Sequence, residues 1–176
     1  GRHILALAAA LVVPGLALGG GFAPAAAATG DPDLGPNVVV FDPSMATSAI
    51  QAKIDEIATK QIDNEMGSNR FALLFKPGTY GSTEAPLNVR VGYYTEVAGL
   101  GLNPTDVTIK GHVDVVNRCF PDGNGGQSCF ALNNFWRSLS NLTIDVTAIG
   151  QDGCRDTATF WAVSQAAPMR RVNVTG

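Results

Sequence analysis

The hydrophobic positions in residues 37–80 follow two different periods. Two short apolar runs, 37–41 and 71–75, have the length and composition of buried strands. Between them a single apolar stripe recurs at helical spacing, at Ile50, Ile54, Ile57 and Ile62. The pattern therefore predicts a strand, a helix and a second strand, followed by a tight turn at Pro77 and Gly78.

The sequence also specifies where this helix begins and what it does. Ser48 and Gln51 form a capping-box pattern, which predicts a helix over residues 48–60. After Tyr80 no second helical stripe occurs, and short alternating segments are separated by Gly, Asn, Asp and Pro. One amphipathic helix followed only by short strands predicts a cap on the open end of a stack of β-coils, because unpaired strand edges invite aggregation.

A weak internal repeat supports this stack. Residues 93–100 align with residues 135–142, and residues 142–144 align with residues 172–174. In the first alignment the paired hydrophobic positions are Val97 with Leu139 and Leu100 with Leu142. Unequal intervals are expected of stacked coils whose loops differ in length, whereas chance similarity in a Gly-rich β sequence is the alternative.

Alternation within the later strands predicts which side chains face the core. The inward set is Val107, Ile109, Val113, Val115, Leu142, Ile144, Val146, Val172 and Val174. The outward set is Thr108, Lys110, His112, Asp114, Thr143, Asp145, Arg171 and Asn173. The outward positions form the surface on which these strands could build a site.

Longer strings in the sequence resemble a known family. AIQAKIDEIA followed by FALLFKPGTYG resembles the opening of secreted right-handed parallel β-helix proteins of the pectate-lyase-like superfamily. Residues 35–176, about 140 of the 176 residues, resemble a narrower group of secreted bacterial proteins labelled coagulation factor 5/8 type domain protein, and sometimes adenylyl cyclase. The resemblance implies an all-β chain, a right-handed parallel β-helix with one amphipathic capping helix. It implies no single chemistry, since the superfamily holds lyases, hydrolases, esterases and adhesins.

The domain organisation follows from this pattern. Arg2 and His3 precede an apolar run, and four alanines before Thr29 offer a cleavage site, so we expect a signal peptide and secretion; an uncleaved membrane anchor is the alternative. The chain has no initial Met and stops after a strand-like segment, so we expect a β-helix that is incomplete here. The predicted parts are a signal peptide (1–28), a linker (29–36), an N-terminal cap (37–80) and the first coils (81–176).

Charge and cysteine content restrict the partners. A formal net charge of −3 and a pI near 5.2, with scattered Lys and Arg, exclude the basic surface expected of a nucleic-acid-binding protein. Cys119 and Cys129 flank a polar loop, and a disulfide between them could contribute about 3 kcal/mol on the chain-entropy estimate. Metal ligation is the alternative, but no His or CxxC spacing accompanies them. Cys154 is left without an assigned partner.

Two carboxylates are candidate catalytic groups. Asp114 and Asp145 are both predicted to lie mid-strand and to face outward, and two carboxylates in one groove can divide the acid and base roles of glycoside cleavage. His112 is one strand step from Asp114 and could orient a general base. The alternative is that all three are solvated strand residues. No metal site and no cofactor are expected.

The aromatic residues are candidate substrate contacts. Trp136, Trp161 and Tyr94 could present ring faces on which sugars stack. The pairs Tyr93–Tyr94, Phe135–Trp136 and Phe160–Trp161 favour instead an internal ladder, in which one member of each pair stacks inside the coil and the other faces outward.

These features favour a secreted carbohydrate-active protein. We expect a polysaccharide hydrolase or lyase whose main catalytic residues lie beyond this sequence, or a non-catalytic cell-surface or glycan-binding module. The expected partner is a polysaccharide or cell-surface glycan, with no nucleic acid and no stable membrane insertion after signal cleavage. No P-loop, GxSxG or HExxH motif is present, and nothing in the sequence supports a cyclase.

Overall fold

The computed structural model describes residues 32–130, 132–147 and 159–176. The chain divides into two units, Gly1–Asp33 and Leu34–Gly176. Almost all of the first unit, with the predicted signal peptide, lies outside the described residues, and so does Cys154.

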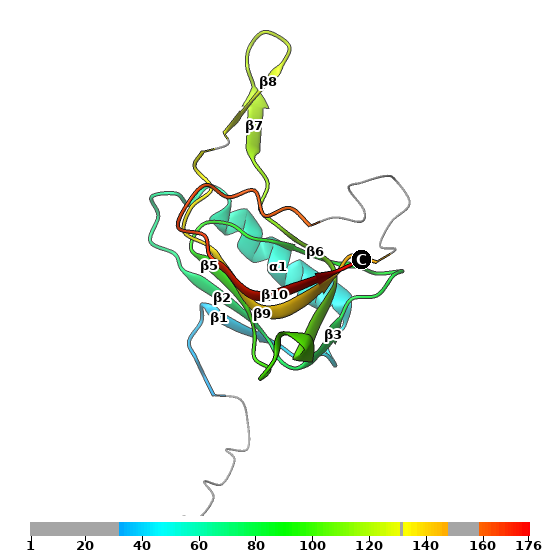
Figure 1. Ribbon diagram of the computed structural model, residues 1–176. Helices are drawn as coiled ribbons and strands as arrows, with labels where there is room; N and C mark the ends of the chain where they lie inside the picture. Colours follow the sequence, from blue (N-terminus) through cyan, green and yellow to red (C-terminus); the bar gives the residue numbers. More distant parts are fainter. Residues whose placement is uncertain (1–31, 131, 148–158) are drawn as a thin grey trace, which may run out of the picture. The chain divides into compact units, whose positions relative to one another are not determined.

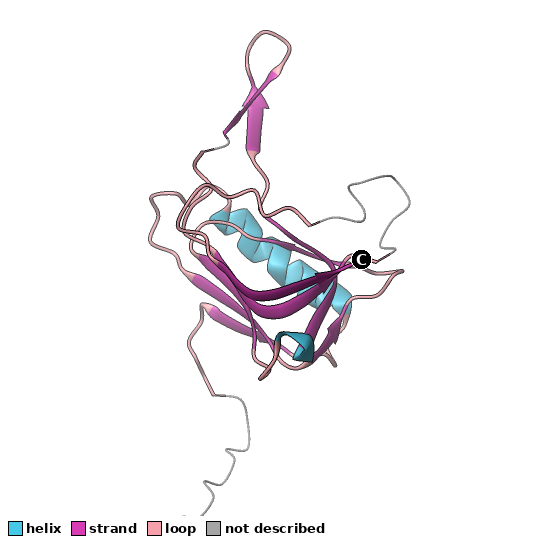
Figure 2. Ribbon diagram, viewed as in Figure 1, coloured by secondary structure: helices cyan, strands magenta, loops and turns pink. Residues whose placement is uncertain are grey.

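Strands form most of the regular secondary structure of the second unit, and loops join them (Figure 2). Its α-helix, α1, spans Thr47–Gln61, and a short 3-10 helix, η1, spans Pro104–Asp106. The strands are β1 Val38–Phe41, β2 Phe71–Phe75, β3 Gly78–Tyr80, β4 Leu87–Arg90, β5 Thr95–Gly99, β6 Val107–Asp114, β7 Arg118–Pro121, β8 Gln127–Phe130, β9 Ser138–Asp145 and β10 Met169–Thr175.

The strands outside the β7–β8 hairpin pair in parallel and form three groups. The first group runs β1, β2, β5, the first half of β9 and the start of β10 (Figure 1). The second joins β3 to the first half of β6, the second half of β9 and the end of β10. The third pairs β4 with the second half of β6, and Val115 continues it through a bridge to Trp161. The chain is therefore all-β with a parallel sheet, as the sequence predicts.

Two strands pass from one group to the next by bending. Strand β6 bends at Gly111, whose φ is +150°, and β9 bends at Asn141, whose φ is +56°. The Asn141 amide stabilises its bend by donating hydrogen bonds to the carbonyls of Gly99 (2.9 Å) and Gly101 (2.7 Å). Because successive segments of one strand face different directions, their hydrophobic side chains converge on one core.

Helix α1 buries the predicted isoleucine face. Ile50, Ile54 and Ile57 belong to the same core cluster as the inward residues of the strands, and each contributes about 1.5–3 kcal/mol by burial. The predicted capping box is wrong. The helix begins after Ala46 without a side-chain cap, so Ser48 already lies inside it.

Gln51 serves the sheet instead of the helix end. Its side-chain amide donates to the carbonyl of Asn88 and its side-chain oxygen accepts from the Asn88 N–H, both at 2.8 Å. These two bonds reproduce the pairing of a neighbouring strand along β4, which is otherwise paired only with β6 in the described residues. The helix thus satisfies a sheet edge, the physical need that the sequence pattern indicated.

The repeat alignments give the observed registers. Val97 pairs with Leu139, and residues 142–144 pair with residues 172–174. The alignment of Leu100 with Leu142 is wrong, because β5 ends at Gly99 and Leu100 is exposed in the turn that follows.

The inward and outward assignments hold with two corrections. Thr143 is buried, because the connection through η1 covers it and its hydroxyl donates to the Pro104 carbonyl (3.0 Å). Val174 is exposed, because β10 pairs only with β9 in the described part of the chain.

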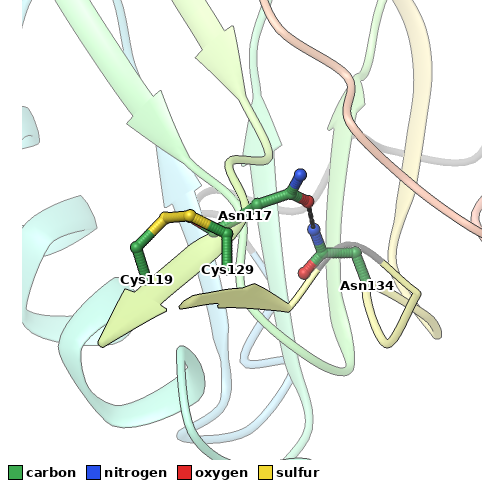
Figure 3. The surroundings of a disulfide bond; sticks show 4 residues. All are labelled: Asn117, Cys119, Cys129 and Asn134. Carbon is green, nitrogen blue, oxygen red and sulfur yellow. Dashed lines mark hydrogen bonds between the residues drawn. A yellow bond between two sulfur atoms is a disulfide. The ribbon is translucent and has the colours of Figure 1, made fainter. Parts of the chain in front are cut away.

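The predicted disulfide is present and joins the two strands of a hairpin. Cys119 and Cys129 are directly opposite each other in the antiparallel pair β7–β8, which rules out metal ligation by these two sulfurs (Figure 3). At the base of the hairpin Asn134 donates a side-chain hydrogen bond to Asn117 (2.9 Å). In the turn the Asp122 carboxylate accepts from the N–H groups of Asn124 and Gly126.

Replacing both Cys119 and Cys129 by serine is expected to loosen the hairpin and spare the core. The side chains of β8 are exposed and none of them belongs to the hydrophobic core, while Arg118 of β7 pairs with Asp63 outside the hairpin. The cross-link therefore constrains a hairpin that can open without disturbing the core. We expect faster amide hydrogen exchange across residues 118–130 and a global unfolding free energy within about 0.5 kcal/mol of the parent. A global loss near the 3 kcal/mol of the chain-entropy estimate would contradict this.

Candidate functional site

An open groove of about 630 Å³ lies where the strands of the first parallel group begin. Its lining residues come from the starts of β1, β2, β5 and β9 and from the segment that leads into β10. Because these strands are parallel and in register, equivalent positions of successive strands lie side by side along the groove.

Three of these equivalent positions form a stacked column. Arg70, Tyr94 and Trp136 occupy matching places before β2, β5 and β9, since Phe71 pairs with Thr95 and Glu96 with Ser138. The Arg70 guanidinium carbon lies 3.4 Å from the centroid of the Tyr94 ring. The Tyr94 and Trp136 rings are 5.2 Å apart and nearly parallel, with an interplanar angle of 6°. Trp136 is 37% exposed.

The backbone holds this column in place. Tyr94 and Trp136 both have positive φ, 50° and 53°, a conformation that disfavours most L-residues and persists where the surroundings impose it. The Tyr94 N–H donates to the Trp136 carbonyl (2.5 Å), and the Tyr94 hydroxyl donates to the Glu65 carbonyl (2.9 Å). These bonds hold the Tyr94 ring and link the backbones of the two residues, and the Trp136 ring stacks on Tyr94.

A buried arginine, Arg137, binds the backbone next to the column. Arg137 is 6% exposed, donates to the carbonyls of Val91 (2.8 Å) and Phe135 (3.0 Å), and lies 4.6 Å from the ring centroid of Tyr93. Burial lowers the pKa of Arg137 to about 10, with the Tyr93 hydroxyl acting in the opposite direction. Burial also raises the pKa of Tyr93. The Arg137 guanidinium thus links the backbone just before β9 to the backbone just before β5.

Polar side chains also line the groove. Glu96 is the one carboxylate among the described residues that line it, and Ser138, its register partner, adds a hydroxyl. The Arg70 guanidinium stacks on Tyr94 and also donates to the carbonyls of Gly67 and Asn69. The groove can therefore offer ring faces and hydrogen-bonding groups, but the part of its lining that the structure describes holds no second carboxylate for paired acid–base chemistry.

The structure separates the predicted aromatic contacts. Tyr94 and Trp136 meet in the groove. Trp161 instead packs against the core, forms an isolated parallel β-bridge with Val115 and donates its indole N–H to the Ala167 carbonyl (3.2 Å). The predicted internal ladder is wrong, because the ring stacking joins the outward members of two pairs. At the next coil the register places Ala166 in the column, since Leu139 pairs with Met169.

The predicted catalytic candidates lie outside this groove and have structural partners. Asp114 accepts a hydrogen bond from the Phe160 N–H (2.7 Å) and so holds the returning chain. Asp145 accepts from the Thr147 N–H (3.0 Å) and pairs with Lys110 (3.8 Å). Hydrogen bonds from Thr147, and then the charge of Lys110, lower the pKa of Asp145, although partial burial opposes them.

The two aspartates lie in different parallel groups. Asp145 is in register with Lys110 before the Gly111 bend, and Asp114 is in register with Arg90 after it. His112 pairs in register with Asn88, also away from the groove. Their catalytic or binding roles therefore stay predictions. Within the described residues no three His, Cys, Asp or Glu side chains gather as a metal site would require.

Sequence reasoning missed Arg70, Glu96 and Arg137. The alignment of 93–100 with 135–142 already placed Glu96 beside Ser138 and could have indicated a shared surface. Arg70 carried no comparable signal, because the repeat did not extend to β2.

Comparison with known proteins gives one consistent result. No protein-family model matches the chain. An exo-beta-1,3-glucanase of Streptomyces sp. (strain SirexAA-E / ActE) is 46% identical over 180 residues, which cover 100% of this chain and 26% of that protein. This chain thus spans about a quarter of the length of the curated relative it matches. The comparison gives no support to the label of coagulation factor 5/8 type domain protein.

Solved structures agree. The structure of sacteLam55A from Streptomyces sp. SirexAA-E matches with a TM-score of 0.63 at 46% identity, covering 82% of this chain and 23% of that one. A variant of the same protein in complex with glucose matches with a TM-score of 0.63, covering 84% and 23%.

Proposed function

We propose that this chain is part of a secreted glycoside hydrolase that acts on a neutral β-1,3-glucan. The observation that carries the proposal is the groove at the strand starts, with its aromatic stack and with one carboxylate among its described lining residues. Aromatic faces suit the apolar faces of sugar rings. The 46% identity to an exo-beta-1,3-glucanase supports the same substrate class.

The charges in the groove favour a hydrolase over a lyase. A lyase acting on uronates needs cations to neutralise the substrate carboxylates. Arg70 and Arg137 both donate to backbone carbonyls and lie over aromatic rings, although one terminal nitrogen of the buried Arg137 has no hydrogen-bond partner among the described residues. Glu96 would repel an anionic sugar. A neutral glucan has no such conflict.

We propose further that the parallel strands form a right-handed β-helix of the pectate-lyase-like kind. The chain contributes one segment to each of the three parallel groups in turn. In one coil these segments are β2, β3 and β4, and in the next they are β5, the first half of β6 and the second half of β6. Parallel connections in one sheet are right-handed in nearly all proteins, which supports this hand.

Export rests on two observations. Residues 1–28 have the composition of a signal peptide, and the Cys119–Cys129 disulfide suits an oxidising compartment. None of the helices in the described part of the chain is both long and apolar enough to span a membrane.

The contribution of this chain is substrate binding and not bond cleavage. Within residues 32–130, 132–147 and 159–176 the groove has a single carboxylate, and Asp114 and Asp145 both hold backbone groups elsewhere. A pair of carboxylates able to cleave a glycosidic bond is therefore expected from other parts of the full-length enzyme. A purely glucan-binding module is the second candidate, favoured by the same lone carboxylate.

The test compares binding and hydrolysis for the 176-residue chain. We expect retardation in affinity gels that contain β-1,3-glucan, none in gels that contain polygalacturonate, and no release of glucose. Stronger retention by polygalacturonate would overturn the hydrolase assignment. Release of glucose that Asp145→Asn abolishes would place catalysis in this chain.

A further inference from the structure

We propose that the face of the Trp136 indole turned away from Tyr94 is a stacking subsite for one pyranose ring of a neutral β-glucan. The inference rests on the proposed function and adds the position and direction of the bound sugar. It assigns a site at the start of β9, separate from Asp114 and Asp145.

The column has one closed end and one open end. At the closed end the Arg70 guanidinium covers the face of Tyr94, with its carbon 3.4 Å from the ring centroid. At the other end Trp136 meets the Phe135 ring in a T-shaped contact, with centroids 5.3 Å apart and 62° between the planes, and the equivalent position in the next coil is Ala166. Ala166 has the same left-handed backbone, with φ of 51°, but carries only a methyl group.

Both Ala166 and Pro168 line the groove beside Trp136. The column of planar groups therefore stops at Trp136 while the groove continues past it. A glucopyranose chair presents an apolar face of axial C–H groups, so it can stack on an indole in the place of the missing fourth layer. The Arg70 guanidinium already covers the outer face of Tyr94, so a sugar ring cannot stack at that end. The sugar therefore stacks at the Trp136 end.

Two polar groups line the groove beside the aromatic stack. Glu96 and Ser138 are register partners, each two residues beyond a ring of the stack, and both line the groove. The Glu96 carboxylate can accept hydrogen bonds from sugar hydroxyls, and the Ser138 hydroxyl can donate or accept. Acceptor groups of this kind suit a neutral sugar and repel a uronate.

The site is preorganised, which reduces the entropy lost on binding. Tyr94 is fixed by bonds from its N–H and its hydroxyl, and Arg137 holds the backbone next to Trp136. The subsite therefore needs no rearrangement of its aromatic stack to receive a ring.

The chain offers a direct spectroscopic test, because it has two tryptophans, Trp136 and Trp161. In the variant Trp161→Phe all tryptophan emission comes from Trp136. Titration with a β-1,3-linked gluco-oligosaccharide is expected to change this emission saturably. By calorimetry Trp136→Ala should weaken binding of the same oligosaccharide about tenfold, equal to about 1.4 kcal/mol.

The matched control is Phe160→Ala. Phe160 is 46% exposed and lies outside the groove lining, so its removal should leave the dissociation constant within about twofold. Circular dichroism and Trp136→Phe, which keeps a stacking ring, separate loss of contact from loss of fold.

The outcomes separate this inference from the proposed function. If the unsubstituted chain binds the oligosaccharide and Trp136→Ala binds it equally well, the subsite is wrong and glucan binding stands. An unchanged Trp136 emission at saturating sugar would overturn the subsite in the same way. If the unsubstituted chain binds no β-1,3-glucan, both the subsite and the proposed substrate are wrong.

Discussion

Replacing Gly111 by alanine is expected to lower the free energy of unfolding by about 3 kcal/mol, the upper range for overpacking a core. Gly111 has φ of +150°, and a β-carbon there would lie 1.9 Å from the carbonyl oxygen of Leu87, its partner in β4. That oxygen belongs to the backbone of a buried strand, so it cannot move aside without separating β4 from β6. Urea denaturation followed by circular dichroism measures the loss.

Gly35→Ala is the matched control for backbone strain alone. Gly35 also has positive φ, +91°, but a β-carbon there would meet nothing within 4 Å. Its substitution should cost about 1 kcal/mol, the usual penalty for a left-handed L-residue. Equal losses for the two variants would show that the approach of β4 to β6 is looser than described.

Replacing Ile54 by alanine is expected to destabilise the chain by about 3 kcal/mol, within the range for truncating a fully buried isoleucine. Ile54 is 0% exposed and lies in the middle of the α1 face that packs into the core. The loss combines the transfer of the removed methyl groups with the cavity that rigid neighbouring strands leave open. The same denaturation experiment reports it.

Two companion variants calibrate this result. Ile54→Val removes one methylene and should cost about 1 kcal/mol. Thr59→Ala changes an exposed position of the same helix and should stay within about 0.5 kcal/mol. A loss below 1 kcal/mol for Ile54→Ala would mean that α1 contributes little to the core, and the interpretation of the isoleucine stripe would fail.

The elements written in local periodicity could be read from the sequence. The isoleucine stripe identified α1, and the continuous apolar runs identified β1 and β2. The repeats went further, because stacked parallel strands place equivalent residues side by side, and the pairing of Val97 with Leu139 followed directly. The disulfide could also be predicted, since both cysteines flank one short loop.

Features that depend on contacts between distant residues could not be read in this way. Gln51 looked like part of a capping box, yet it pairs with the backbone of Asn88, because an unsatisfied strand edge outweighs a helix end that water can solvate. Thr143 looked exposed until the connection through η1 covered it.

In the groove, too, some features could be predicted from the sequence and others depended on contacts between distant residues. The sequence determined that aromatic pairs return at intervals, and it identified Tyr94 and Trp136 as candidates. Only the tertiary structure decided that these two rings stack, that Arg70 closes their column and that Trp161 turns to the core. The reason is physical. Loops of unequal length separate the strands, so sequence spacing alone leaves open which side chains become neighbours, and the hydrogen-bonded register of parallel strands fixes it.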